Sequence, residues 1–194
     1  MRTSLLLVVG LAWLAAIRPA AAGGPDPGPW VPASRQAAQA LGSALMSELS
    51  AALAVSPVEA ISVCSTRAPS IATEHSARLG ATVGRTALRI RNPANAPAAW
   101  QREVLHEFAR RLEAGADPAS LEYVAEVKVG EATERRFMKP IMTAPLCLTC
   151  HGDAPAPELA KTIAERYPED QATGFAAGEM RGAFYVLWRD TGAE

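Results

Sequence analysis

The sequence lacks the features that mark several common classes of protein. Its 19 Lys and Arg residues nearly balance 20 Asp and Glu residues, which leaves a formal net charge of -1. Such a chain has no positive excess with which to attract nucleic acid or an anionic membrane surface. It contains no internal repeat and no low-complexity tract beyond a short Gly- and Pro-rich segment, which argues against a repeat architecture. With 194 residues, it is long enough for one ordinary domain and too short for two well-filled cores.

Long hydrophobic runs are also scarce, and the most pronounced run lies at the N-terminus. It extends from Leu5 to Ile17 after Arg2, and small residues follow up to Ala22. A charged start, a short apolar stretch and an A-x-A end are the parts of a secretory signal peptide. The stretch is shorter than the roughly 20 residues that a transmembrane helix requires, which favours cleavage over an uncleaved anchor. We therefore expect a signal peptide at residues 1–22 and a mature chain in the periplasm.

We expect neither a lipid anchor nor a membrane span in the mature chain. No cysteine follows the expected cleavage site closely enough to carry a lipid anchor, and we expect no later segment to be long and apolar enough to span a bilayer. Residues 23–33 are rich in Gly and Pro and are expected to form an irregular leader. Residues 34–194 are expected to form a single domain.

The first part of this domain is predicted to be helical. Apolar residues recur at i, i+4 spacing from Ser34 onwards. Ser56 and the proline after it are typical of the cap and first residue of a second helix. This helix carries Cys64, and Pro69 should break or kink it. A third helix is predicted over residues 70–79.

The second part mixes strand and helix patterns separated by Gly- and Pro-rich turns. The predicted elements are a strand (residues 82–90), a helix (98–114), a hairpin (123–129 and 135–141), a helix (158–167) and a final strand (181–188). Helices followed by strands that alternate with helices indicate an α+β domain with a small antiparallel sheet.

Cysteine and histidine are rare, with three of each, yet three of these six residues form one motif. Cys147, Cys150 and His151 make a C-x-x-C-H sequence. Two thiols about one helical turn apart match the two vinyl groups on one side of a haem, and the adjacent histidine is then delivered to the iron. Because the motif occurs once, we predict one covalent haem c, with His151 as an axial ligand. Secretion fits this prediction, since bacteria attach such haems outside the cytoplasm.

Three other interpretations of the motif are weaker. A thioredoxin-like redox pair would open a helix early in a βαβ unit, whereas this motif follows a predicted hairpin late in the chain. Zinc would have to combine Cys64 with Cys147, Cys150 and His151, and the consecutive Cys150 and His151 would strain to reach one small tetrahedral ion. A structural disulfide between the motif cysteines would leave the histidine unexplained.

Cys64 is left unpaired once a haem takes the other two thiols. One interpretation is a small buried hydrophobic residue, which free cysteine often is. The other is a thiolate bound to the ferric iron as its sixth ligand. Other candidates for that position are Met180, Met46, Met138, Met142, His75 and His106. Arg85, Arg89 and Arg91 cluster on and just after the predicted strand, where they would either be solvated or pair with the haem propionates.

Four patches of the sequence together resemble a known family of proteins. They are residues 59–64 (EAISVC) with 68–69, residues 89–97 (RIRNPANAP), residues 140–152 around the haem motif, and residues 167–183, beginning YP and ending GEMRGA. The set is similar to secreted bacterial and cyanobacterial single-haem c-type proteins of a PAS-like fold, and the patches cover most of the mature chain. The resemblance implies a PAS-like domain and an iron held by His151 and Cys64, because Cys64 matches the family's ligand cysteine in the early helix.

This ligand set leads us to expect a redox sensor, with a small gas as a further candidate ligand. An anionic thiolate stabilises the ferric state, and reduction would weaken its bond to the iron and let it leave. The main alternative is a low-potential single-haem electron carrier that stays six-coordinate. A third class, an enzyme such as a peroxidase, would need an open polar distal side, and we expect no enzymatic activity. A sensor without an output domain would signal through a separate redox or signalling partner.

Overall fold

The computed structural model describes residues 28–190, so the expected signal peptide and the first part of the leader lie outside the described residues. Helices and strands alternate along the chain after a helical N-terminal part. In chain order the elements are α1 (Trp30–Val55), α2 (Pro57–Ser62), the π-helical turn η1 (Val63–Arg67), α3 (Ala68–Leu79), β1 (Thr82–Thr86), η2 (Pro93–Asn95), α4 (Ala99–Glu113), η3 (Pro118–Ser120), β2 (Tyr123–Val129), β3 (Ala132–Met142), η4 (Pro145–Cys147), α5 (Leu148–His151), α6 (Pro157–Arg166) and β4 (Met180–Asp190).

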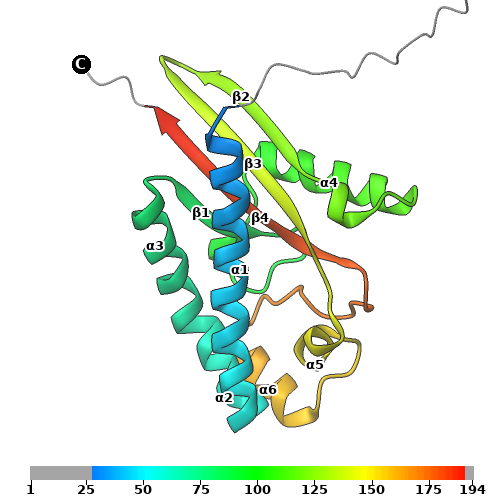
Figure 1. Ribbon diagram of the computed structural model, residues 1–194. Coiled ribbons are helices and arrows are strands. Elements are labelled where there is room, and N and C mark those ends of the chain that lie inside the picture. The colour runs from blue at the N-terminus through cyan, green and yellow to red at the C-terminus, as the bar shows by residue number, and fades with distance from the viewer. Residues whose placement is uncertain (1–27, 191–194) are drawn as a thin grey trace, which may run out of the picture.

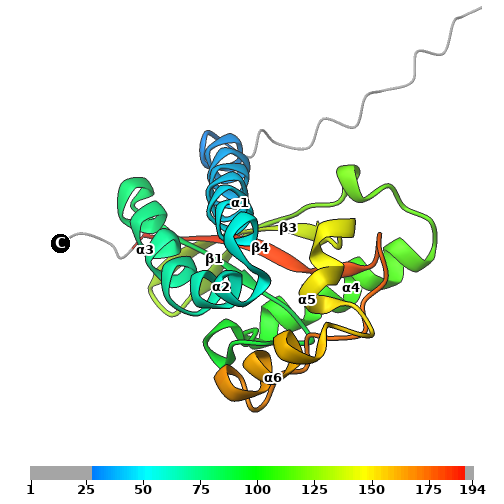
Figure 2. The same ribbon diagram turned by 90° about the horizontal axis from the view of Figure 1, so that it is seen from below.

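The strands form one four-stranded antiparallel sheet in the order β1-β4-β3-β2. Helices α1 and α3 pack on one face of this sheet, and α4 packs on the other (Figures 1 and 2). The core under α1 and α3 is built on Phe137 and Val186, and the core under α4 on Phe108 and Met138. The predicted α+β class with a small antiparallel sheet is thereby confirmed.

Helix α1 begins at Trp30, before the expected start at Ser34, so the last residues of the predicted irregular leader are helical. Pro32 lies in the first turn, where its missing N–H group costs no intrahelical hydrogen bond. The turn is also anchored to the sheet, because Trp188 Nε1 donates to Ser34 Oγ at 2.8 Å and Val31 is fully buried. These contacts between distant parts of the chain outweigh the local Gly and Pro signals.

By length and composition alone, α1 is long and apolar enough to cross a membrane. This corrects the expectation that no segment after the first meets that criterion. A core helix of a globular domain meets it as well, and a single such helix is weak evidence for a span. Leu41 and Leu45 of α1 pack into the core against the sheet.

Strand β1 ends at Thr86, earlier than predicted, because the chain turns away from β4 there. Thr86 Oγ1 donates to the carbonyl oxygen of Asn95 at 2.9 Å, and Asn92 Oδ1 accepts from the backbone of Ala94 in the turn that follows. Arg89 and Arg91 consequently lie on the loop after the strand. The other predicted elements agree with the structure to within a few residues.

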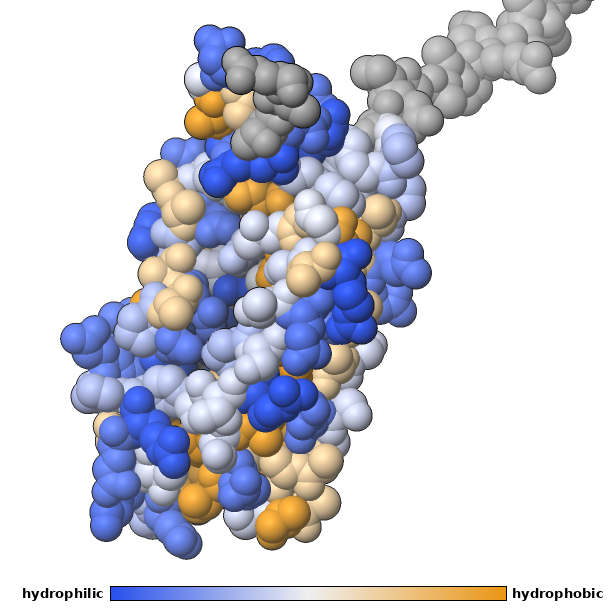
Figure 3. Space-filling view, turned by 90° about the vertical axis from the view of Figure 1, so that its left-hand side faces the viewer, coloured by the Kyte–Doolittle hydropathy of each residue, from blue (hydrophilic) through white to orange (hydrophobic). Residues whose placement is uncertain are grey.

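The surface mixes charged and apolar residues. Figure 3 shows this for the side on which α3 lies, with more hydrophobic surface toward the end of the molecule where α1 meets α2. Within residues 28–190, the exposed large hydrophobic side chains belong to three separate parts of the chain: Met46 and Val55, Val129, and Leu146. Scattered exposed residues of this kind are ordinary for a folded domain.

Candidate haem-binding site

The C-x-x-C-H motif forms a short helical segment directly after β3. Cys147 ends η4, and Cys150 and His151 lie on the single turn of α5. The turn stops at Gly152, where a Cβ atom would stand 2.7 Å from the carbonyl oxygen of Leu148. Glycine therefore lets the chain leave the helix immediately after the histidine. The structure thus places the two motif thiols about one turn apart, as thioether attachment requires.

Cys64 lies on η1, a π-helical turn between α2 and α3. The backbone N–H of Ala68 bonds to the carbonyl oxygen of Val63, five residues back. Two nearby sequence features favour this widened turn. Pro69 has no N–H to donate to the usual helical acceptor. The hydroxyl groups three and four residues after Ser62, the residue that caps the turn, donate to the Ser62 carbonyl oxygen at 3.0 and 2.7 Å. Single π turns of this kind frequently occur at functional sites.

The two hydroxyl groups belong to Ser65 and Thr66, which stand three and four residues beyond Ser62 and share its carbonyl oxygen. Taking up that acceptor loosens the regular helical ladder at this point. The turn therefore follows from hydroxyl side chains placed just before a proline, a local signal that the sequence does contain.

The fold brings Cys64 to the motif from a distant part of the chain. Cys150 packs against the cluster that joins α2 to α6, which contains Ile61 and Tyr167. Figures 1 and 2 show α2, α5 and α6 at the same end of the molecule. Burial raises the pKa of the Cys64 thiol and of the Cys150 thiol, and the charge of Cys64 raises the pKa of Cys150 further. The two sulfur atoms therefore share one electrostatic environment.

The competing interpretations of the motif gain no support from this geometry. Cys64, Cys147 and Cys150 are all free thiols. Among residues 28–190, no group of three or more His, Cys, Asp or Glu side chains is gathered closely enough to hold a metal ion. The motif also follows a strand of an antiparallel sheet, whereas a thioredoxin-like pair follows a strand of a βαβ unit.

His151 is held in the form that can bind iron. Its Nδ1 atom lies 2.6 Å from the carbonyl oxygen of Ala172. A carbonyl oxygen only accepts, so the proton sits on Nδ1 and the lone pair of Nε2 is left for a metal. Burial, with the nearby charges of Arg181 and Arg91, lowers the pKa of His151 to about 3. The imidazole is therefore neutral at ordinary pH.

Four arginines surround this part of the molecule, three of which are predicted from the sequence. Arg89 donates to the carbonyl oxygen of Gln171 at 3.3 Å and to Glu179 at 3.2 Å. Arg91 forms a buried ion pair with Asp170 at 3.0 Å. Both are thus committed to the loop between α6 and β4, and neither is simply a solvated strand edge.

Arg181 is not among the site residues predicted from the sequence. It lies on β4 and donates to the carbonyl oxygen of Arg89 at 3.1 Å. Phe175, which is also absent from the prediction, packs beneath the guanidinium groups of Arg89 and Arg181, at 3.8 and 5.1 Å from its ring centroid. The same ring meets His151 edge-on at 6.2 Å. The sequence around the start of β4 gives no sign of these contacts, because they form only when the loop between α6 and β4 folds back onto Arg89 and His151.

The arginine cluster has unmet capacity to bind an anion. Within the described part of the chain, the Nε atoms of Arg91 and Arg181 are buried and have no hydrogen-bond partner. Burial lowers the pKa of Arg85, and burial with the charges of Arg91 and Arg85 lowers that of Arg181 to about 10. A carboxylate bound here would accept hydrogen bonds from the unpartnered Nε atoms and would compensate the buried arginine charges. Unpaired arginine donors beside a neutral histidine and three free thiols fit a haem c with its two propionates.

The rival iron ligands are spread over several elements of the fold. Met138 and Met180 pack in the core under α4, and His106 is exposed on the surface of that helix. Met46 is 42% exposed on α1. The remaining two lie on α3 and at the end of β3: His75 and Met142.

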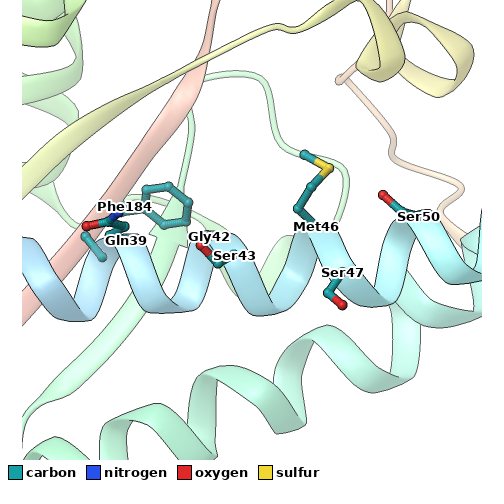
Figure 4. A pocket seen from close by; sticks show the side chains of 8 residues that line it. Gln39, Gly42, Ser43, Met46, Ser47, Ser50 and Phe184 are labelled. Atoms are coloured by element: carbon teal, nitrogen blue, oxygen red, sulfur yellow. The ribbon is translucent and has the colours of Figure 1, made fainter.

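Two grooves of the surface lie along α1. One has a volume of about 500 Å³ and is lined by α1 and by Phe184 of β4. Figure 4 shows Phe184, Met46 and Ser50 on one side of the helix. A Cβ atom on Gly42 would stand 3.0 Å from the Phe184 ring, so glycine permits this close packing. A second groove of about 320 Å³ shares Phe184 with the first. Neither groove includes a predicted site residue.

Comparison with known proteins agrees with this picture. Residues 26–188 match the model of the family described as Tll0287-like. The crystal structure of the cyanobacterial heme-protein Tll0287 is similar in fold, with a TM-score of 0.53 and 28% sequence identity over 66% of this chain and 73% of that chain. No curated protein matches the chain significantly. Since the family model covers most of the sequence, the chain belongs to the Tll0287-like family.

Proposed function

We propose that this protein is a periplasmic c-type haem protein that responds to redox state through a haem held between His151 and Cys64. The observation that carries the proposal is that the fold brings Cys64 close enough for its charge to act on Cys150, the neighbour of His151, although Cys64 lies far from both in the sequence. All three side chains are half-buried. The family assignment supports it, because the related cyanobacterial protein is a heme-protein.

Each residue of the site would have its own role in binding the haem. Cys147 and Cys150 would form thioether bonds to the vinyl groups, and His151 would donate the Nε2 lone pair. Arg85 and Arg181 are the best placed arginines for the propionates, because no ion pair joins either to a carboxylate within residues 28–190. The sheet with its flanking helices supports the PAS-like fold that the resemblance implies.

The nature of the sixth ligand supports a role in sensing. A bound haem supplies a one-electron redox centre. A Cys64 thiolate is a soft anionic donor that favours ferric iron and a low reduction potential. A reduced haem would hold an anionic donor less tightly, so Cys64 would take up a proton from solvent and withdraw, which would leave room for a small gas. With Cys64 in place that space is closed, which supports a protein without enzymatic activity. The signal would pass to a separate protein.

Binding of carbon monoxide to the reduced protein tests this role. We expect the reduced wild type to bind carbon monoxide or nitric oxide readily, because Cys64 has left the iron, and the oxidised protein to resist both. Absorption spectra before and after addition of each gas report the outcome. A reduced protein that stays six-coordinate and refuses both gases would contradict the sensor role and favour a low-potential electron carrier.

The periplasmic location rests on the N-terminal segment, which is consistent with a signal sequence or an anchor. We expect cleavage after Ala22, since the A-x-A pattern ends there. N-terminal sequencing of protein produced in a bacterium should begin near Gly23. Recovery of Met1 on a membrane-bound form would contradict the cleavage and point to an anchor.

A further inference from the structure

The loop between α6 and β4 holds the His151 ring through a chain of hydrogen bonds. The Nδ1 atom donates to the carbonyl oxygen of Ala172 at 2.6 Å. The backbone N–H of Ala172 in turn donates to Oδ1 of Asp170 at 2.8 Å. The Asp170 carboxylate therefore holds Ala172 in place, and the carbonyl oxygen of Ala172 accepts the hydrogen bond from the His151 ring.

Arg91 joins this loop to the haem motif. Its Nη2 atom lies 3.0 Å from Oδ2 of Asp170, 2.7 Å from the carbonyl oxygen of Cys150 and 3.2 Å from that of Ala172. One nitrogen thus contacts the residue that precedes His151 and the residue that holds its ring. A shift of the Arg91 side chain would move both contacts together.

Burial makes this arrangement rigid. The side chains of Arg91 and Asp170 are each only 8% exposed. Charged hydrogen bonds are stronger in such surroundings than in water, and loss of one partner leaves an uncompensated buried charge. The other carboxylate beside the arginines, Glu179, is 43% exposed and pairs with Arg89. The two acidic residues are therefore placed differently, although both neighbour the same cluster.

We propose that Asp170 and Arg91 are positioning residues for His151, which fix the orientation of its ring and the hydrogen bond on Nδ1. Outer partners of this kind orient a metal-bound histidine and raise its basicity. The role of His151 toward iron rests on the proposed function, whereas the hydrogen-bond chain belongs to the polypeptide itself. The ion pair occupies Arg91 with this task and leaves Arg85 and Arg181 for the propionates.

The exchange of the His151 ring proton with solvent tests the proposal. NMR spectra of the reduced haem-loaded protein would follow the Nδ1 proton in the wild type, in Asp170→Asn and in Arg91→Lys. Loss of a supporting hydrogen bond should speed this exchange by about 10-fold in both variants. Arg91→Lys keeps the charge but loses the planar guanidinium group that fixes the Nη2 atom between the three oxygen atoms. The same result in both variants therefore identifies positioning rather than charge.

Glu179→Gln is the matched control, because it removes a carboxylate from the same arginine cluster without touching Ala172. Its exchange rate should equal that of the wild type. The resonance Raman frequency of the iron–histidine bond provides a second readout and should fall only in the first two variants. Equal exchange rates in all four proteins would overturn the proposal.

The wild type alone keeps the proposal falsifiable if Asp170→Asn does not fold. Its ring proton must be protected from exchange, and an unprotected proton would overturn the proposal directly. The proposed function fails separately, through a protein that carries no covalent haem. The hydrogen-bond chain is present in the polypeptide, so the protection is also expected in a preparation without haem.

Discussion

Replacing Cys64 with alanine should convert the ferric protein from a low-spin form to a high-spin or water-ligated form. The thiolate is the sixth ligand in our account, and alanine has no donor to replace it. The reduction potential should rise by a substantial part of the roughly 0.8 V range that axial ligands span, because an anionic donor is lost. Absorption and electron paramagnetic resonance spectra, with a redox titration, would measure these changes.

Met180→Ala is the control for this substitution. Met180 lies where many small cytochromes c keep their methionine ligand, after the motif, but its side chain packs with the core under α4. Its replacement should leave the ferric spectrum unchanged. An unaltered ferric spectrum in Cys64→Ala would show instead that the thiol is a small buried hydrophobic residue, and it would make the electron-carrier role the better one.

Replacing both Cys147 and Cys150 with alanine should abolish covalent attachment of the haem. None of the residues left in the motif can form a thioether, so haem that still binds should pass into acid acetone. Haem staining of denatured protein after electrophoresis would measure the loss, which should be essentially complete. Cys64→Ala serves as the control, since it removes a thiol but should keep the haem attached. Covalent haem in the double variant would contradict the attachment site.

The elements that are determined by neighbouring residues could be predicted from the sequence. Ser56 Oγ accepts from the backbone of Glu59 at 3.0 Å, as the capping sequence indicates, and α2 begins there. The hairpin of β2 and β3 and the last strand also follow from alternation and turn residues. The haem motif lies on adjacent residues, so its geometry could be inferred without knowing the fold.

Features that depend on distant contacts could not be predicted in the same way. Arg91 reaches Cys150 and Ala172 across a long stretch of sequence, and a lone Asp170 in a turn-rich segment gives no sign of its burial. Arg181 could not be predicted for the same reason, because only the fold brings it close to Arg91. Cys64 could be singled out as an unpaired thiol, but its place at the site follows from packing between α2 and α6.

The central claim is that a haem is bound covalently, and the most direct test is the mass of the wild-type polypeptide after acid–acetone extraction. If Cys147 and Cys150 carry the haem, the denatured chain should keep its colour and show the mass of the mature polypeptide plus one haem. A colourless chain of unmodified mass, with all of the haem in the acetone, would contradict the account.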